Sequence, residues 1–261
     1  QPAAGAGQPG CGAGPARTGE PDGSTQRVRE LGRGQVRVRK ARGYDRVYVA
    51  GDERGGGRAH RMCLDHPDKV VKAGIIDIVP TLDMWAAMNR EGSIGGWHWP
   101  FMAQPQGFPE MFFNAVDPDW FMRKKLLKLT KDLSHIPPEI WSEYVRCFNE
   151  KTIRGSCGDY RAAATIDCAL DTADLGRKLL MPILVLWGNT SSVGKRFADP
   201  IGLWKLRAED VRGEALPSGH YVNEDARERS LDWVVRFFSY DPATPDHAQG
   251  TALGGIAGCY Q

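Results

Sequence analysis

A carboxylate framed by glycines is the feature of this sequence with the most direct chemical meaning. Gly51 and Gly55 flank Glu53 in the pattern Gly-x-Nu-x-Gly, between a strand-like run and a helix-like run. Flanking glycines permit the sharp turn of a nucleophile elbow, which lifts one side chain above a sheet. A carboxylate at the apex would attack carbon and form an ester intermediate, in contrast to serine-type acyl transfer. The spacing alone also fits an ordinary glycine-rich turn.

Two further residues follow in the order that such chemistry needs. Asp77 stands at the end of the second strand-like run, and His220 lies in the loop after the fourth. A histidine in this place would activate water against the ester, and the acid would fix the tautomer of the imidazole. The alternative for His220 is a loop histidine without a chemical role.

The elements that must position these residues alternate along the chain. Strand-like runs cover residues 44–51, 72–79, 181–188 and 214–217, and helix-like runs cover 55–66, 199–208 and 223–238. This alternation predicts an α/β fold with a mostly parallel sheet covered on both faces, with ligands bound at the carboxyl ends of its strands. A helical segment rich in tryptophan follows the second strand. We therefore expect a core made of residues 43–80 and 178–238, with residues 81–177 inserted as a cap.

Composition limits the other classes of function. Residues 1–42 are rich in Gly, Pro, Ala and Arg and contain no aromatic side chain, so we predict disorder there and in residues 239–261. A net charge of +2 argues against nucleic acid or a polybasic membrane surface as the partner. No run approaches the ~18–20 apolar residues of a spanning helix, and the start has no signal-peptide pattern. Six scattered cysteines predict reduced thiols and a cytoplasmic protein.

Several segments together resemble one family, the haloacetate (fluoroacetate) dehalogenases of the α/β-hydrolase superfamily. The resemblance covers residues 44–238 and is carried by Gly51–Gly56, Ala59–Pro67, Asp77–Thr81, Gly96–Trp99, Asp159–Ala162 and Leu216–His220. It implies hydrolysis of the carbon–halogen bond of a short 2-haloacid such as fluoroacetate, without a cofactor. His60, Cys63 and His66 have a spacing that invites a zinc site, but the family carries similar residues without metal, so we expect no metal.

The resemblance also implies a role for each matching residue. Glu53 stands where the family has its nucleophilic aspartate, Asp77 matches the triad acid and His220 matches the base. The substrate-binding positions are Arg54 for the carboxylate, with Arg58 nearby, and His98, Trp99 and Tyr160 for the departing halide. Fluoride is a poor leaving group, so donors aimed at it would stabilise charge that develops in the transition state. An arginine fork suits a small carboxylate. Without the resemblance, His98, Trp99 and Tyr160 would be read as cap packing.

The sequence departs from the family pattern near the apex. The family has His-Asp where this chain has Asp52-Glu53, and the extra methylene misplaces the carboxylate by roughly 1 Å, which can cost ~10²-fold in rate. Asp52 is not expected to replace Glu53, because only the apex side chain is raised into the pocket. The family's second carboxylate-binding arginine falls at Gly57, and Arg58 is one helical step of ~100° away.

The opening of the family's fold has no counterpart in residues 1–43, which contain neither its first strands nor its His-Gly loop. The resemblance therefore implies a partial sheet with an unpaired edge at residues 44–51. Whether a homodimer covers this edge is left open. Two alternatives to the dehalogenase remain: an epoxide hydrolase-like enzyme of the same fold, against which the His98-Trp99 pair argues, and a catalytically inactive, degenerate α/β hydrolase.

Overall fold

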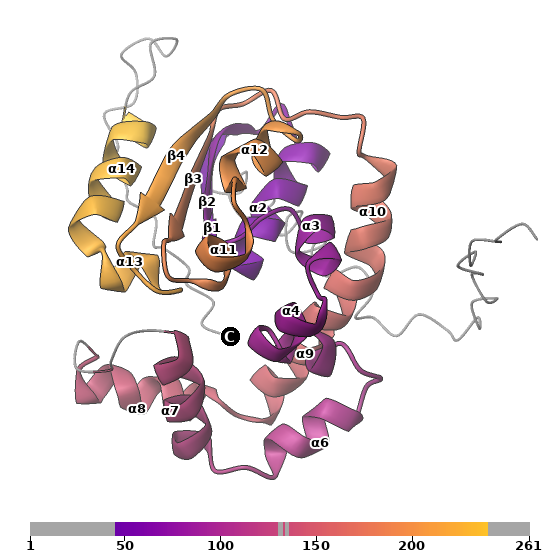
Figure 1. Cartoon of the computed structure of the whole chain (residues 1–261), viewed down its shortest axis with the longest axis vertical. Helices are drawn as coiled ribbons and strands as arrows, with labels where there is room; N and C mark the ends of the chain where they lie inside the picture. The colour runs from indigo at the N-terminus through magenta and orange to yellow at the C-terminus, as the bar shows by residue number, and fades with distance from the viewer. Residues whose placement is uncertain (1–44, 130–132, 134–135, 240–261) are drawn as a thin grey trace, which may run out of the picture.

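A computed structural model describes residues 45–129, 133 and 136–239 (Figure 1). The predictions of disorder for residues 1–42 and 239–261 therefore lie outside the described residues, except for Ser239, which ends the last helix. None of the helices in the described ranges is long and apolar enough to cross a membrane.

The centre of the fold is a parallel sheet in the order β1-β2-β3-β4. Its strands are β1 (Val47–Asp52), β2 (Val70–Ile76), β3 (Ile183–Gly188) and β4 (Val211–Leu216). The predicted parallel sheet is confirmed, although β4 begins three residues before the predicted run at 214. The early part of β4 was missed because Arg212 interrupts its apolar pattern. Among the described residues, β1 forms one edge of the sheet, as expected.

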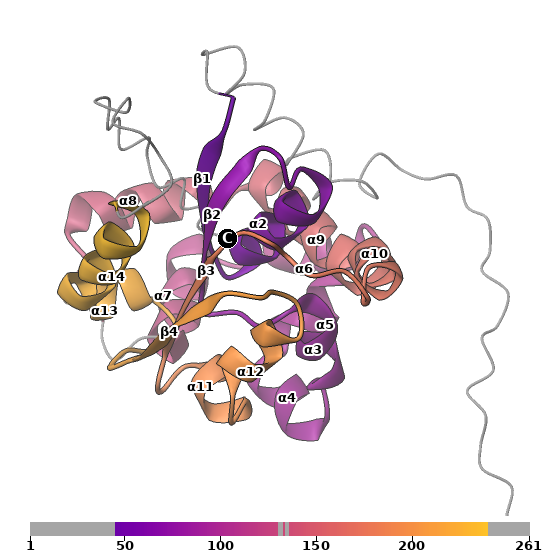
Figure 2. The ribbon, with the colours of Figure 1, turned by 90° about the horizontal axis from the view of Figure 1, so that it is seen from above.

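Helices cover both faces of this sheet. Successive residues of a strand point to opposite faces, and in the central strands both sets are apolar, so both faces need to be covered. Ile75 and Ile183 are buried in one apolar cluster, and the residues that follow them, Ile76 and Leu184, are buried in the other. Figures 1 and 2 show the helices on the two sides. The first side carries α2 (Arg54–Asp65) and α12 (Pro200–Lys205), and the second carries α13 (Val222–Asp225) and α14 (Arg227–Ser239).

A long helical insertion separates β2 from β3 and lies across the carboxyl ends of the strands (Figure 1). It contains α3 (Thr81–Ala86), α4 (Arg90–Gly95), α5 (His98–Met102), α6 (Phe108–Asn114), α7 (Pro118–Leu129), α8 (Pro138–Cys147), α9 (Glu150–Ala162), the π-helix η1 (Ala163–Asp167) and α10 (Cys168–Ala173). These helices occupy the segment expected to form a cap, whose bounds at 81 and 177 stay a prediction.

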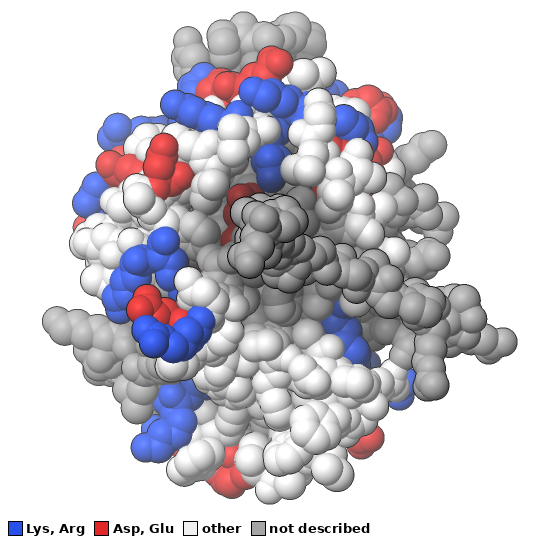
Figure 3. Space-filling view, turned by 45° about the vertical axis from the view of Figure 1, so that its right-hand side comes forward, with Lys and Arg blue, Asp and Glu red and all other residues white. Residues whose placement is uncertain are grey.

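Aromatic side chains fill the interior of this helical part. Phe121 of α7 stacks on Phe148 with ring centroids 4.9 Å apart and meets Phe113 of α6 edge-on at 5.2 Å. The outer face of α6 instead exposes Phe108 and Phe112, and the lower part of the surface in Figure 3 is largely uncharged. The packing of Phe121 thus ties α7 to its neighbours and decides which of its faces points inward.

Candidate functional site

Glu53 occupies the strained turn that the glycine spacing predicts. It lies directly between β1 and α2 with φ 49° and ψ −117°, a conformation that is costly for a residue with a side chain. A Cβ on Gly51 would lie 2.1 Å from the carbonyl carbon of Gly55, so this close approach requires glycine. The Glu53 carboxylate accepts a hydrogen bond from the Arg54 amide (2.6 Å) and one from the Tyr160 hydroxyl (3.4 Å).

Asp77 and His220 meet beside this turn, at the ends of β2 and β4. The Nδ1 atom of His220 is 2.5 Å from Oδ2 of Asp77, while Oδ1 of Asp77 accepts the Gly188 amide (3.0 Å) and the Ser191 hydroxyl (2.6 Å). Ser191 also caps α11 (Ser192–Arg196) and so has a fixed position. Our sequence analysis missed Ser191; the signal that could have found it is a serine placed just after a strand and before a helix.

Three carboxylates raise the basicity of the His220 imidazole. Burial lowers the pKa of His220, but the hydrogen bond and charge of Asp77, with the charges of Asp52 and Glu53, outweigh burial and raise this pKa to about 9. The imidazole is therefore protonated at neutral pH. It must lose this proton before it can act as a general base.

Asp52 is one of the carboxylates whose charge acts on His220, although the sequence analysis did not expect it to replace Glu53. Burial raises the pKa of Asp52 to about 7, against the opposing charge of His220 and with the support of the Asp77 and Glu53 charges. Its Oδ1 atom is buried and has no hydrogen-bond partner among the described residues. The carboxylate, which also has a hydrogen bond with the Glu53 backbone, thus acts on His220 through its charge.

The three side chains expected to hold a halide lie together on the side of Glu53 that faces the helical insertion. The ring of Tyr160, on α9, meets the rings of His98 and Trp99, both on α5, nearly edge-on at 5.6 Å and 5.3 Å. Trp99 and Tyr160 are buried. In sum, the ends of β1, β2 and β4 place a carboxylate, an acid and a histidine opposite a set of polar aromatic groups.

Comparison with known proteins identifies the family. No protein-family model matches the chain. A fluoroacetate dehalogenase from Burkholderia sp is 36% identical over 205 residues, which is 78% of this chain and 67% of that protein. The chain belongs to the haloacetate dehalogenase-like α/β hydrolases. A soluble epoxide hydrolase from Corynebacterium sp. (strain C12) is 27% identical over 76% of the chain and 68% of its own length. The crystal structure of a provisionally named α/β hydrolase from Nostoc sp PCC 7120 superposes with a TM-score of 0.78 at 39% identity, covering 82% of this chain and 73% of that one.

Arg54 and Arg58 of this haloacetate dehalogenase-like chain form ion pairs with aspartates of the helical insertion. Arg54 is buried, with its Nε 2.8 Å from Asp159 and its Nη2 2.8 Å from Asp167. Arg58 reaches the other oxygen of Asp159 at 3.0 Å. Nη1 of Arg54 lies 3.5 Å from where a Cβ of Gly57 would stand. The role of Arg54 and Arg58 toward a substrate carboxylate stays a prediction.

The dehalogenase-like site also depends on an irregular helix. Asp167 ends the π-helix η1, and the Trp85 indole donates a hydrogen bond to the Ala163 carbonyl at its start (3.0 Å). Sequence analysis missed the roles of Asp167 and Trp85, since no simple sequence pattern marks a π-helix. The described residues contain no group of three or more His, Cys, Asp or Glu side chains that could hold a metal ion. His60 instead packs edge-on against Trp204 with ring centroids 5.3 Å apart.

Proposed function

We propose that this chain hydrolyses the carbon–halogen bond of a short 2-haloacid through an ester of Glu53. The observation that carries the proposal is the position of the Glu53 carboxylate, raised on a strained turn beside the Asp77–His220 pair and 3.4 Å from the Tyr160 hydroxyl. In this mechanism the carboxylate is the nucleophile, and the donors receive the leaving anion once Glu53 has moved aside.

The reaction would proceed in two steps. A Glu53 oxygen attacks the carbon that bears the halogen, the carbon–halogen bond breaks with its electron pair, and the halide leaves toward His98, Trp99 and Tyr160. Neutral His220 then takes a proton from water, and the resulting hydroxide attacks the carboxyl carbon of the ester. This second step releases the 2-hydroxyacid and restores the Glu53 carboxylate.

The test is halide release from fluoroacetate and chloroacetate, with mass spectrometry of the peptide that contains Glu53. Slow release is expected from the native chain and none from Glu53→Gln, which keeps the length of the side chain without its nucleophile. A His220→Gln variant should accumulate a carboxymethyl ester on Glu53, because the second step then lacks its base. Release by Glu53→Gln at the native rate, or no release by the native chain, contradicts the proposal.

An epoxide hydrolase is the second candidate, supported by the similarity to the Corynebacterium protein. The same nucleophile and histidine would open an epoxide, but that reaction needs an acid to protonate the epoxide oxygen. Tyr160 is one such donor, and its hydroxyl is already directed to Glu53. Diol formation from styrene oxide, assayed beside halide release, separates the two candidates.

A further inference from the structure

Arg196, at the end of α11, has a guanidinium group for which the site described above gives no role. Its Nη2 atom donates a hydrogen bond to the Gly92 carbonyl of α4 (3.0 Å). Its Nη1 atom is buried and has no hydrogen-bond partner among the described residues. An unpaired buried donor costs free energy, and burial also lowers the pKa of Arg196. The contacts with α4 must therefore hold the guanidinium in place.

Gly95 and Gly96, at the end of α4, leave the space that this guanidinium fills. A Cβ on Gly95 would lie 2.5 Å from Nη2 of Arg196, and a Cβ on Gly96 would lie 3.3 Å from both Nη atoms. Figures 1 and 2 show α4 beside α11. Because these two residues have no side chain, Arg196 packs directly on the backbone where α4 ends.

Packing in the apolar core does little to fix α4. Gly92 is the buried residue of this helix, whereas Arg90, Glu91 and Ile94 are exposed, Ile94 to 70%. A helix with so few buried side chains shifts at a low cost in free energy. The contact with Arg196 therefore contributes much of what holds α4 against α11.

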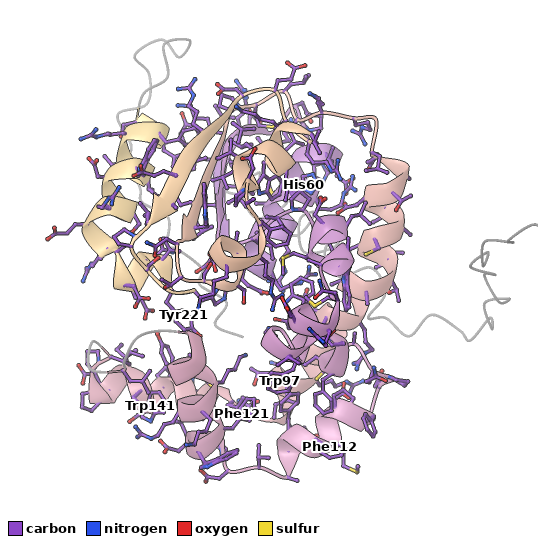
Figure 4. The ribbon with its side chains drawn as sticks, in the orientation of Figure 1. His60, Trp97, Phe112, Phe121, Trp141 and Tyr221 are labelled. Carbon is purple, nitrogen blue, oxygen red and sulfur yellow. The ribbon has the colours of Figure 1, made fainter. Side chains whose placement is uncertain are left out.

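The end of α4 leads directly into α5, the helix that carries two of the proposed halide donors. The Gly96 carbonyl accepts a hydrogen bond from the Trp99 amide (2.9 Å), and the ring of Trp97 meets the ring of His98 edge-on at 6.0 Å (Trp97 is labelled in Figure 4). Trp99 is buried, whereas His98 is half-buried, so the position of His98 depends more on the backbone before it. A shift of α4 would therefore move the first donor of α5.

We propose that Arg196 is a positioning residue that aligns His98 and Trp99 with the departing halide, by holding the end of α4 from α11. The proposal rests on the proposed function for the role of these two donors. Donors stabilise a leaving anion when their positions are fixed before the reaction, and a misplacement of about 1 Å can cost ~10²-fold in rate. Fluoride needs the donors more than chloride does, because it is the poorer leaving group. Loss of Arg196 should thus affect a fluorinated substrate most.

The dependence on the leaving group separates positioning from a general loss of structure. We would measure kcat for fluoroacetate and for chloroacetate, because the ratio of the two values does not depend on the fraction of the protein that is active. Arg196→Met removes the guanidinium but keeps an unbranched stem, and should raise the chloroacetate-to-fluoroacetate ratio by about tenfold. Lys195→Met changes the exposed basic residue next to it on α11 and is the matched control, which should keep the ratio within about twofold.

Gly95→Ala disturbs the same contact from the side of α4. Its methyl group would lie 2.5 Å from Nη2 and so displace the guanidinium, and the ratio should change in the same direction. In a protein that already carries Arg196→Met, Gly95→Ala should have no further effect, because the group that it displaces is absent. An equal effect of Gly95→Ala in both backgrounds overturns the assignment. Circular dichroism verifies that each variant is folded.

Binding of bromide provides a test that does not require turnover. Sodium bromide is titrated at constant ionic strength, and the indole N–H signal of Trp99, assigned by its loss in Trp99→Phe, reports binding in NMR spectra. Arg196→Met should weaken bromide binding by about tenfold, and Lys195→Met by less than about twofold.

The bromide titration and the rates together distinguish the two proposals. Weaker bromide binding by Arg196→Met, in a chain that releases no halide, supports the role of Arg196 and contradicts the proposed function. The assignment is overturned if Arg196→Met binds bromide like the native chain, if it leaves the ratio of the rates unchanged, or if the native chain does not bind bromide.

Discussion

Shortening the nucleophile is the most informative change that can be made to this protein. For in-line attack, the nucleophilic oxygen stands roughly 3.3 Å from the carbon, and the halide beyond that carbon accepts a hydrogen bond of about 2.8 Å, so oxygen and donor are about 6 Å apart even before the carbon–halogen bond is counted. Oε1 of Glu53 is only 3.4 Å from the Tyr160 hydroxyl. The pair therefore falls short of this distance by at least about 2.6 Å, and Glu53 must swing aside before a substrate can enter.

Glu53→Asp removes one methylene, about 1.5 Å of reach, and so recovers part of that distance. Because a misplacement of about 1 Å can cost 10²-fold, we expect kcat/KM for chloroacetate to rise by about 10²-fold or more. The assay is steady-state chloride release, with Glu53→Gln as the inactive control and circular dichroism to verify the fold. If Glu53→Asp is no faster than the native chain, the length of the side chain does not limit the reaction, and the reasoning from the 3.4 Å contact is wrong.

Three other variants test the electrostatics and the packing of the site. Because the His220 imidazolium must lose its proton, chloride release should rise with pH through a midpoint near the pKa of about 9. Asp52→Asn removes a negative charge that raises this pKa, so the midpoint should move to lower pH. An unchanged pH–rate profile would contradict this expectation. Arg54→Met leaves the buried Asp159 and Asp167 without their shared cation, so urea denaturation should show that the free energy of unfolding falls by about 3–5 kcal/mol. A decrease below about 1 kcal/mol would refute the stabilising role of the buried ion pairs. Tyr160→Phe removes one halide donor, and kcat for fluoroacetate should fall by about 10²-fold without a matching loss of stability, as halide release and thermal melting will show.

The sequence predicted the parts of the site that depend on local geometry. The glycine spacing around Glu53 specifies a strained turn because only glycine fits the 2.1 Å approach at Gly51. Asp77 and His220 could be placed because parallel strands bring their carboxyl ends to one edge of the sheet. The four strands were found from their apolar runs, except for the start of β4, where the exposed, charged Arg212 hides the pattern.

Other features depend on packing between distant segments, which no local pattern records. The pairing of Arg54 with Asp167 joins residues 113 positions apart, and no sequence pattern indicates that Asp159 and Asp167 both contact this arginine. The spacing at the apex likewise says nothing of the charge that Asp52 exerts on His220.

The π-helix η1 makes this site sensitive to the length of the chain as well as to its composition. Eight regular α-helical steps of ~100° from Asp159 would end about 80° beyond two full turns, which directs residue 167 away from Arg54. A π-helix uses more residues per turn, and here it returns Asp167 to the side that Asp159 faces, so that both contact Arg54. Deleting a single residue between Ala163 and Asp167 would leave every other functional side chain in the sequence and still release the arginine from one of its partners. The wider turn of the π-helix thus brings a second carboxylate to Arg54, just as a substitution that adds a negative charge there would do.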